Sequence, residues 1–173
     1  MARVLAEYPY RFAVAQSPQQ RAEAFRLRGA VTGTGWDEDG YDEAALQVLG
    51  RDEAGVLVST GRIVLPPGPL PTEDVCGIVV EPAGRVADVG RMCVAPAYRS
   101  YRQAAFVALL CALYRQIRRR GHPVACGMMS SQVRRLVRLL GLDLVELGPD
   151  REYLGEARAP VRFQLVASAV RPE

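Results

Sequence analysis

The chain has 173 residues, which suits a single domain with its own hydrophobic core, so we expect one domain over residues 1–173. Its hydrophobic share of 49%, its charged share of 24% and its net charge of +3 are those of an ordinary globular protein; no apolar run predicts a membrane span, and no motif predicts nucleic-acid binding. Because the sequence has 1 histidine, it offers little for a zinc site or a Ser-His-Asp triad, and we expect no metal.

A strand and a helix are predicted at the start of the chain. Residues 10–16 have the composition of a short strand. Ser17 is a good helix N-cap and Pro18 suits the first helical position, which predicts a helix over residues 17–30.

The next segment is predicted to be a loop, a strand and a proline-rich excursion. Residues 31–46 are rich in glycine and acidic residues, which indicates a surface loop or flap. Asp42 has a second interpretation as the N-cap of a helix over residues 43–50. Residues 55–67 read as a strand that ends at Pro-Pro, and the excursion follows over residues 67–85.

Strands and helices alternate in the second half. The predicted strands cover residues 85–96, 123–129, 142–148 and 160–168, and the predicted helices cover residues 100–121 and 130–141. This order indicates an α/β fold with a mixed sheet flanked by helices, because a doubly wound fold would alternate more regularly.

The predicted strand over residues 85–96 carries two charges in an apolar run. Val89, Met92 and Val94 suit a buried strand, yet Asp88 and Arg91 lie among them, and burying an unpaired charge is costly. Two interpretations remain open. Either the two charges face a polar site, or they form a buried ion pair that shapes the sheet.

The order of elements resembles that of the GNAT acyltransferase superfamily. In that fold the middle strands of the sheet splay apart, and a motif Q/R-x-x-G-x-G/A at the following helix holds an acyl thioester. Arg99 and Ala104 fit the ends of the motif, whereas Arg102 replaces its first glycine. The resemblance implies a set of thioester-binding residues: Val94, Arg99, Arg102, Gln103, Ala104 and Ser130. For Ser130, N-capping of the next helix is the alternative.

One branch resembles the chain more closely, namely the acyl-homoserine lactone synthases and the long-chain N-acyl amino acid synthases. The residues that match its pattern in order are Arg21, Phe25, Trp36, Asp39, Asp42, Arg62, Asp88 and Arg91. The resemblance implies that those before residue 88 bind the substrates. The alternatives are a core position for Phe25 and a solvated turn for Asp39 and Asp42.

The resemblance also implies the chemistry. A bulge near Gly90 would let Asp88 and Arg91 project together into a cleft with Arg62. Asp88 would accept a proton from an amine or orient it. Backbone N–H groups near Met92 and Cys93 would stabilise the carbonyl oxygen. The acyl group would pass directly to the amine, so we do not expect Cys93 to be a covalent nucleophile.

We therefore expect an N-acyltransferase that moves a long-chain fatty acyl group to the amine of an amino acid, peptide or related small molecule. No cofactor is expected to stay bound, and the co-substrate is an acyl carrier protein or acyl-CoA thioester. Arg102 in place of glycine favours the carrier, and two arginine-rich faces at residues 118–120 and 134–138 would steer an acidic carrier. Apolar residues 103–113 would line an acyl tunnel or form core.

Three alternatives remain for the function: an acetyl-CoA-dependent acetyltransferase, an acyl-homoserine lactone synthase, and a catalytically silent acyl-thioester-binding fold. The N-terminus lacks the apolar core of a signal peptide, and the four cysteines form no C-x-x-C pair. Reduced thiols and a cytoplasmic location are therefore expected.

Overall fold

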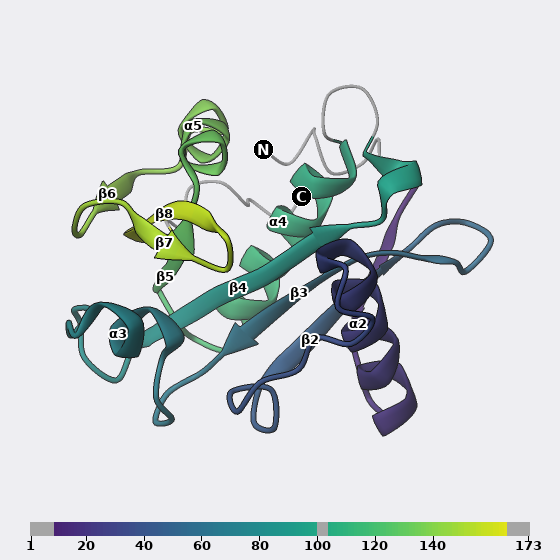
Figure 1. Ribbon diagram of the computed structural model, residues 1–173. Helices are drawn as coiled ribbons and strands as arrows, with labels where there is room; N and C mark the ends of the chain where they lie inside the picture. Colours follow the sequence, from purple (N-terminus) through teal and green to yellow (C-terminus); the bar gives the residue numbers. More distant parts are fainter. Residues whose placement is uncertain (1–8, 100–103, 166–173) are drawn as a thin grey trace, which may run out of the picture.

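The computed structural model describes residues 9–99 and 104–165, in which the strands form one mixed sheet (Figure 1). Its order is β1-β2-β3-β4-β5-β8-β6, and β7 pairs with β8 beside this path. The strands are β1 (Arg11–Val14), β2 (Leu46–Arg51), β3 (Leu57–Val64), β4 (Val86–Val94), β5 (Val124–Met129), β6 (Leu144–Glu146), β7 (Arg151–Tyr153) and β8 (Glu156–Gln164). The pair β4–β5 is parallel and all other pairs are antiparallel. The predicted mixed α/β architecture is therefore confirmed.

Helices cover both faces of this sheet (Figure 1). They are α2 (Pro18–Thr32), α3 (Pro71–Cys76), the 3-10 helix η1 (Pro96–Tyr98), α4 (Ala104–Arg119) and α5 (Ser131–Leu139). Ser17 caps α2 as predicted, because its hydroxyl accepts a hydrogen bond from the backbone N–H of Gln20 at 3.2 Å. In the part of the chain that the structure describes, no helix is long and apolar enough to cross a membrane.

Three elements differ from the prediction: the strand β2, the helix α3, and the strand β7, which lies where no strand was predicted. The segment expected as a helix over residues 43–50 contributes strand β2, which pairs with β1 and β3. Val48 packs into the core under α4 and Leu49 packs under α2, so burial on both faces outweighs the helical composition. Inside the proline-rich excursion lies the short helix α3, with Pro71 at its first turn.

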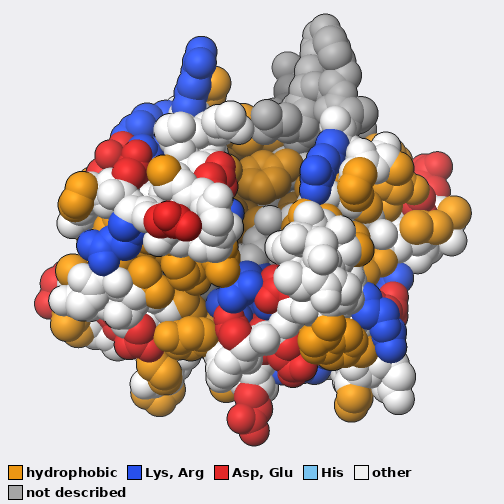
Figure 2. Space-filling model, viewed as in Figure 1, with side chains coloured by type: hydrophobic (Ala, Val, Ile, Leu, Met, Phe, Trp, Pro, Cys, Tyr) orange, Lys and Arg blue, Asp and Glu red, His pale blue; other side chains and the backbone are white. Residues whose placement is uncertain are grey.

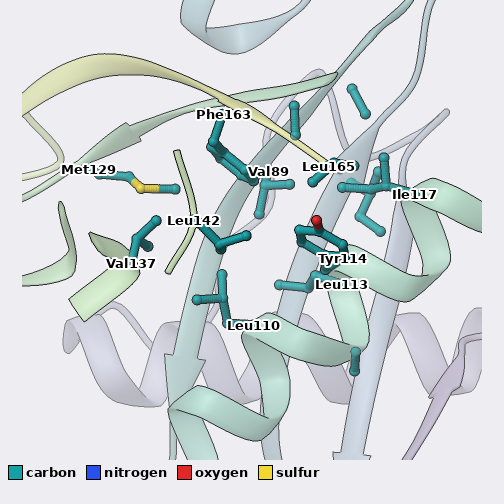
Figure 3. Packing of buried hydrophobic residues seen from close by; sticks show 14 of the residues in the cluster. Val89, Leu110, Leu113, Tyr114, Ile117, Met129, Val137, Leu142, Phe163 and Leu165 are labelled. Carbon is teal, nitrogen blue, oxygen red and sulfur yellow. The ribbon is translucent and has the colours of Figure 1, made fainter. Parts of the chain in front are cut away.

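The main core lies between the sheet and α4 (Figure 3). Leu110, Leu113 and Ile117 of α4 pack against Val89 of β4 and Phe163 of β8, and all five are at most 2% exposed. The apolar helix predicted in this region is confirmed as a buried element. Its aliphatic side chains therefore contribute to stability through the area they remove from water.

The middle of the sheet is open at one end. Strands β4 and β5 pair over three residues only, from Val86↔Val124 to Asp88↔Cys126. Beyond that point β4 stays with β3 and β5 stays with β8, so the two strands diverge. At the divergence a Cβ on Gly127 would lie 2.6 Å from the carbonyl oxygen of Val89, so only glycine permits this backbone contact. The predicted splay of the middle strands is confirmed.

Candidate active site

A bulge in β4 lies beside the opening between β4 and β5. Arg62 of β3 pairs with Gly90 and Thr60 pairs with Cys93, so Gly61 faces both Arg91 and Met92. Arg91 has a φ of +50°, which is uncommon for a residue other than glycine. The bulge is where the sequence predicted it, within one or two residues. It shifts the alternation of side chains so that Arg91 lies on the same face as Arg62.

Three arginines and three aspartates form a charge-balanced network on this face. It contains Arg28 of α2, Arg62 of β3, Arg91 of β4, and Asp37, Asp39 and Asp42 of the loop between α2 and β2. We call this set the arginine–aspartate network. It joins α2 and the loop that follows it to the strands β3 and β4, and it holds the loop over the bulge.

Asp42 is the buried centre of the arginine–aspartate network, with an exposed fraction of 0%. Both its oxygens accept hydrogen bonds from Arg28 at 2.9 Å, and Oδ1 also lies 3.2 Å from Arg62. Gln47 Nε2 donates to it at 2.8 Å. Burial alone would raise the pKa of Asp42, but the hydrogen bonds from Arg28 and from the Asp39 backbone and the charge of Arg62 lower it overall. The predicted solvated turn is therefore wrong for Asp42.

Arg91 binds the two more exposed acids of the network. Its guanidinium donates to Asp37 at 2.5 Å and to Asp39 at 2.8 Å. Asp39 also accepts from Arg62 at 2.5 Å. The predicted alternative of a buried Asp88–Arg91 ion pair is wrong, because Arg91 is paired with Asp37 and Asp39 instead.

Arg21 lies outside the network and holds the same loop by its backbone. Its guanidinium donates to the carbonyl oxygens of Asp42, Glu43 and Ala45. A carbonyl has no net charge, so the Arg21 side chain keeps its own positive charge uncompensated by these contacts. Arg21 therefore fixes the loop and also presents charge to the cavity beside it.

That cavity, which we call the outer pocket, has a volume of about 940 Å³ between α2 and the loop. Arg21, Phe25, Trp36 and Asp39 line it, as do Glu38, Gly40 and Glu43. The rings of Phe25 and Trp36 meet edge to face at 5.5 Å. Trp36 is 45% exposed, whereas Phe25 is 4% exposed, so Phe25 is a core residue with one edge on the pocket. Four residues predicted to bind substrate thus meet at one cavity.

A second cavity, which we call the central groove, fills the opening between β4 and β5 and has a volume of about 490 Å³. Figure 2 shows a hollow between the surface over β7 and β8 and the surface over α2, with hydrophobic side chains at its back. Predicted residues that line the groove are Arg91, Met92, Cys93, Val94, Arg99 and Ser130. Ser130 is at the N-cap position of α5, but its side chain makes no capping hydrogen bond.

Other predicted thioester-binding residues are placed less directly. Arg99 donates to the carbonyl oxygen of Val94 at 3.0 Å, which turns its side chain along the groove wall. Ala104 begins α4, and Phe106 is the α4 residue that lines the groove. Arg102 and Gln103 lie outside the described residues.

Asp88 is a buried carboxylate next to the bulge, 3% exposed. Its Oδ2 atom accepts hydrogen bonds from the backbone N–H of Thr72 at 2.8 Å and from the Cys126 thiol at 3.6 Å. Burial raises the pKa of Asp88, and the hydrogen bonds with Thr72 and the charge of Arg62 only partly oppose this rise. Oδ1 lies 3.9 Å from the point where a Cβ would sit on Gly90, which lines the groove. Asp88 itself does not line the groove, so its carboxylate lies behind Gly90 in the wall.

The Cys93 thiol lines the groove but is not activated. Burial raises the pKa of Cys93 to about 12, so it is protonated at neutral pH. Within residues 9–99 and 104–165, no group of three or more histidine, cysteine, aspartate or glutamate side chains is placed to hold a metal ion.

Sequence analysis missed Arg28 and Asp37 as members of the site. Arg28 lies one helical turn after Phe25, and its guanidinium lies 5.3 Å from the centre of that ring. Asp37 directly follows Trp36 in the sequence. The available signal was therefore position beside two predicted pocket residues.

No protein-family model and no curated protein sequence matches the chain, whereas many solved structures match its fold. The AHL synthase LasI is 16% identical with a TM-score of 0.76, and the match covers 91% of this chain and 91% of LasI. The CoA-dependent acyl-homoserine lactone synthase BjaI is 16% identical with a TM-score of 0.73, covering 87% and 78%. FeeM, an N-acyl amino acid synthase from uncultured soil microbes, is 17% identical with a TM-score of 0.68, covering 89% and 88%. At such identities the likeness shows the fold, which is the predicted GNAT-like fold.

Proposed function

Starting from the GNAT-like fold, we propose that this protein transfers an acyl group from a thioester to an amine. The observation that carries the proposal is the central groove between β4 and β5, with the bulge of β4 in its wall and a buried carboxylate beside the bulge. Such an arrangement supplies what amide formation needs: a slot for the donor, hydrogen-bond donors for the carbonyl, and a proton acceptor.

The acyl thioester binds in the central groove. A bulge leaves its extra residue outside the ladder with the neighbouring strand, and β4 has no partner on the β5 side beyond Asp88. Backbone N–H groups near Met92 and Cys93 therefore serve as hydrogen-bond donors to the thioester carbonyl. They act on the oxygen as it gains negative charge during attack. Met92, Met128 and Phe106 give the groove an apolar lining for the acyl chain.

The amine acceptor binds in the outer pocket. Its walls combine the aromatic rings of Phe25 and Trp36 with the carboxylates of Glu38, Asp39 and Glu43. Carboxylates attract an ammonium group, and an exposed tryptophan face attracts cations as well. Arg62 and Arg91 are tied to Asp39 and so set the position of its carboxylate.

The reaction proceeds by direct attack. The amine nitrogen forms a C–N bond with the carbonyl carbon, and its proton passes to Asp88 directly or through water. The C–S bond breaks, the thiolate leaves, and it takes a proton from solvent. A raised pKa suits Asp88 to this task, because a carboxylate with an ordinary pKa is a weaker base. The protonated Cys93 thiol takes no covalent part.

The donor is an acyl carrier protein or a coenzyme A thioester carrying a fatty acyl chain. Arg135 is exposed on α5 and would meet an acidic carrier, and Arg138 is exposed as well but is paired with Glu146 at 2.6 Å. Arg134 is excluded from that surface, because it is buried and bonded to Asp150 and the Met129 carbonyl. The aliphatic residues of α4 pack as core, so the acyl chain must use the groove itself.

Intact-mass spectrometry of carrier proteins and coenzyme A thioesters loaded with C2 to C16 acyl chains, mixed with the protein and a pool of amines, tests the proposal. We expect loss of the acyl mass from a long-chain donor only when amines are present, with Asp88→Ala as the inactive comparison. Transfer from acetyl-CoA alone would favour an acetyltransferase. Absence of transfer from every donor would overturn the proposal and favour a silent thioester-binding fold.

A further inference from the structure

The two cavities share one wall, and that wall is an ion pair. Asp39 lines the outer pocket, Arg91 lines the central groove, and their side chains are joined at 2.8 Å. If the acceptor enters one cavity and the thioester the other, this ion pair lies between the two reactants. How this ion pair is opened to bring the two reactants together is a question that rests on the proposed function.

Arg91 is the least firmly held arginine of the arginine–aspartate network. Arg28 and Arg62 are buried, with side chains 2% exposed, and both bind the fully buried Asp42. Arg91 is 14% exposed and binds only Asp37 and Asp39, which are 13% and 24% exposed. The Nε atoms of Arg62 and Arg91 are both buried with no hydrogen-bond partner in the described part of the chain, so exposure and the lack of a contact with Asp42 are what set Arg91 apart.

The backbone of Arg91 is also strained. A φ of +50° is a left-handed conformation that a residue other than glycine holds only when its surroundings fix it. In this site the register of the bulge fixes it, because Gly90 and Cys93 pair with Arg62 and Thr60 of β3 on either side. The guanidinium can therefore leave the two aspartates by rotation of its side chain while the backbone keeps its place.

Release of Arg91 leaves no aspartate of the network without a cation. Asp39 keeps Arg62 at 2.5 Å, and Asp37 keeps Arg28 at 3.4 Å. The freed guanidinium already lines the groove, where water can hydrate it. The rest of the network thus persists when this one member moves.

We propose that the Asp39–Arg91 ion pair is a displaceable partition, and that a positively charged acceptor in the outer pocket opens it by taking the place of Arg91 on Asp39. The acceptor class is then an amine that carries a cation complementary to Asp39, and the thioester stays apart from the outer pocket until such an acceptor is bound. Asp39 and Arg91 together determine specificity for charge.

Trp36 reports binding without any turnover, since it is the single tryptophan and lines the outer pocket. We would titrate the protein with L-arginine amide, whose guanidinium mimics that of Arg91, and with L-citrulline amide, which has the same α-amine but an uncharged urea in place of the guanidinium. We expect arginine amide to bind about tenfold more tightly, because it makes a charge-assisted hydrogen bond to Asp39. Asp39→Asn should remove this preference.

Arg91→Met removes the competitor for Asp39 and should tighten arginine amide binding by about two- to fivefold, as expected for a partly exposed ion pair. The matched control is Arg51→Met, which removes an arginine at the end of β2 that is paired with Glu23 at 2.8 Å and lines neither the outer pocket nor the central groove. Thermal unfolding of each variant verifies that it is folded. Unchanged or weaker binding by folded Arg91→Met, or equal binding of both amides to the wild type, would overturn the partition.

A second readout is thiol release from octanoyl-CoA without any amine. We expect it to be faster in Arg91→Met than in the wild type, because water then approaches the thioester from the outer pocket as well as from the open side of the groove. An equal or slower release would count against the partition. If neither protein releases thiol with or without amines, the proposed function fails, and the Trp36 titration still decides the partition.

Discussion

The two faces of the strands β2, β3 and β4 differ in what they bury. On the face under α4 lie Val48, Ile63 and Val89, and on the opposite face lie their immediate sequence neighbours Gln47, Arg62 and Asp88. All six are at most 3% exposed. Because side chains of a strand alternate between faces, one short stretch of each strand supplies both an apolar core and a charged one.

The difference shows which face serves stability. Apolar burial is favourable in itself, whereas a buried charge must recover the cost of leaving water through its partners. The arginine–aspartate network recovers it by pairing each charge. Asp88 does not recover it in this way, because among the described residues no ion pair joins it to an arginine. An imperfectly compensated charge next to a groove is typical of a functional group.

Asp88→Asn is expected to give the largest effect. If Asp88 accepts the proton of the amine, turnover falls by about 10²- to 10⁴-fold, while the overall shape of the site is kept. Steady-state thiol release in the presence of an acceptor measures this. A variant with nearly wild-type turnover would show that Asp88 has only a structural part.

The same variant tests the pH dependence. The pKa of folded Asp88 is raised above its ordinary value of 3.8, so the folded state binds this proton more tightly than the unfolded state. Its contribution to the free energy of unfolding therefore falls as the pH rises from 3.8 through the raised pKa. Asp88→Asn lacks this loss and should be the more stable protein above that window. Denaturant unfolding at several pH values measures the difference.

Asp42→Asn probes the arginine–aspartate network, in which each charge is paired. We expect a loss of about 3–5 kcal/mol in the free energy of unfolding, because Arg28 stays buried without its carboxylate. The pKa of Asp42 is lowered, so its stabilising contribution is present above the ordinary value of 3.8 and disappears as the pH falls toward the folded pKa. The variant should lack that acid-dependent loss. Equal acid sensitivity of the two proteins would contradict the assignment.

Leu113→Ala probes the apolar face. Leu113 is 0% exposed in the main core, so truncation should cost about 2–5 kcal/mol of unfolding free energy through lost burial and a residual cavity. This loss should not depend on pH between about 4 and about 8, because no titratable group is removed. Turnover per folded molecule should stay near the wild-type value. A large fall in turnover would contradict the assignment of this face to stability alone.

Cys93→Ala should give the smallest effect. A thiol whose burial raises its pKa to about 12 is neither a nucleophile nor a charged partner at neutral pH. Acyl transfer should therefore continue, and no acyl-protein adduct should be seen by mass spectrometry of either protein. An adduct on wild-type Cys93 that is lost in the variant would replace direct transfer with a covalent route.

Much of the fold was predictable because its signals are local. Ser17 and Pro18 predict the start of α2, whereas the bulge that the register of β4 confirms was expected from the resemblance to the GNAT superfamily. Strand β2 was not predictable in the same way. Its residues have ordinary helical composition, and its burial between β1 and β3 arises only when distant strands meet.

The residues of the candidate site also fall into a group that the sequence predicted and a group that it did not. Asp39, Asp42 and Arg62 were identified by the resemblance to the acyl-homoserine lactone synthases, and the structure brings them together. Arg28 was missed because a charged residue within a helix is usually solvated, and nothing local reveals that a loop will fold over it. That folding depends on a contact at Gly29, where a Cβ would lie 2.2 Å from the backbone nitrogen of Trp36. Long-range charge pairing leaves no periodic trace in the sequence.

Gly127 constrains the angle at which β4 and β5 diverge to form the central groove. Its backbone rests directly on the Val89 carbonyl, so the vertex at which β4 and β5 part is a contact between two main chains. The angle between β4 and β5 cannot be changed gradually by substitution of Gly127, because any larger residue there would force the two strands apart. Under the proposed function, changes in the acyl group that is accepted must therefore arise farther along the two strands, at positions such as Met92 and Met128, while Gly127 stays constant.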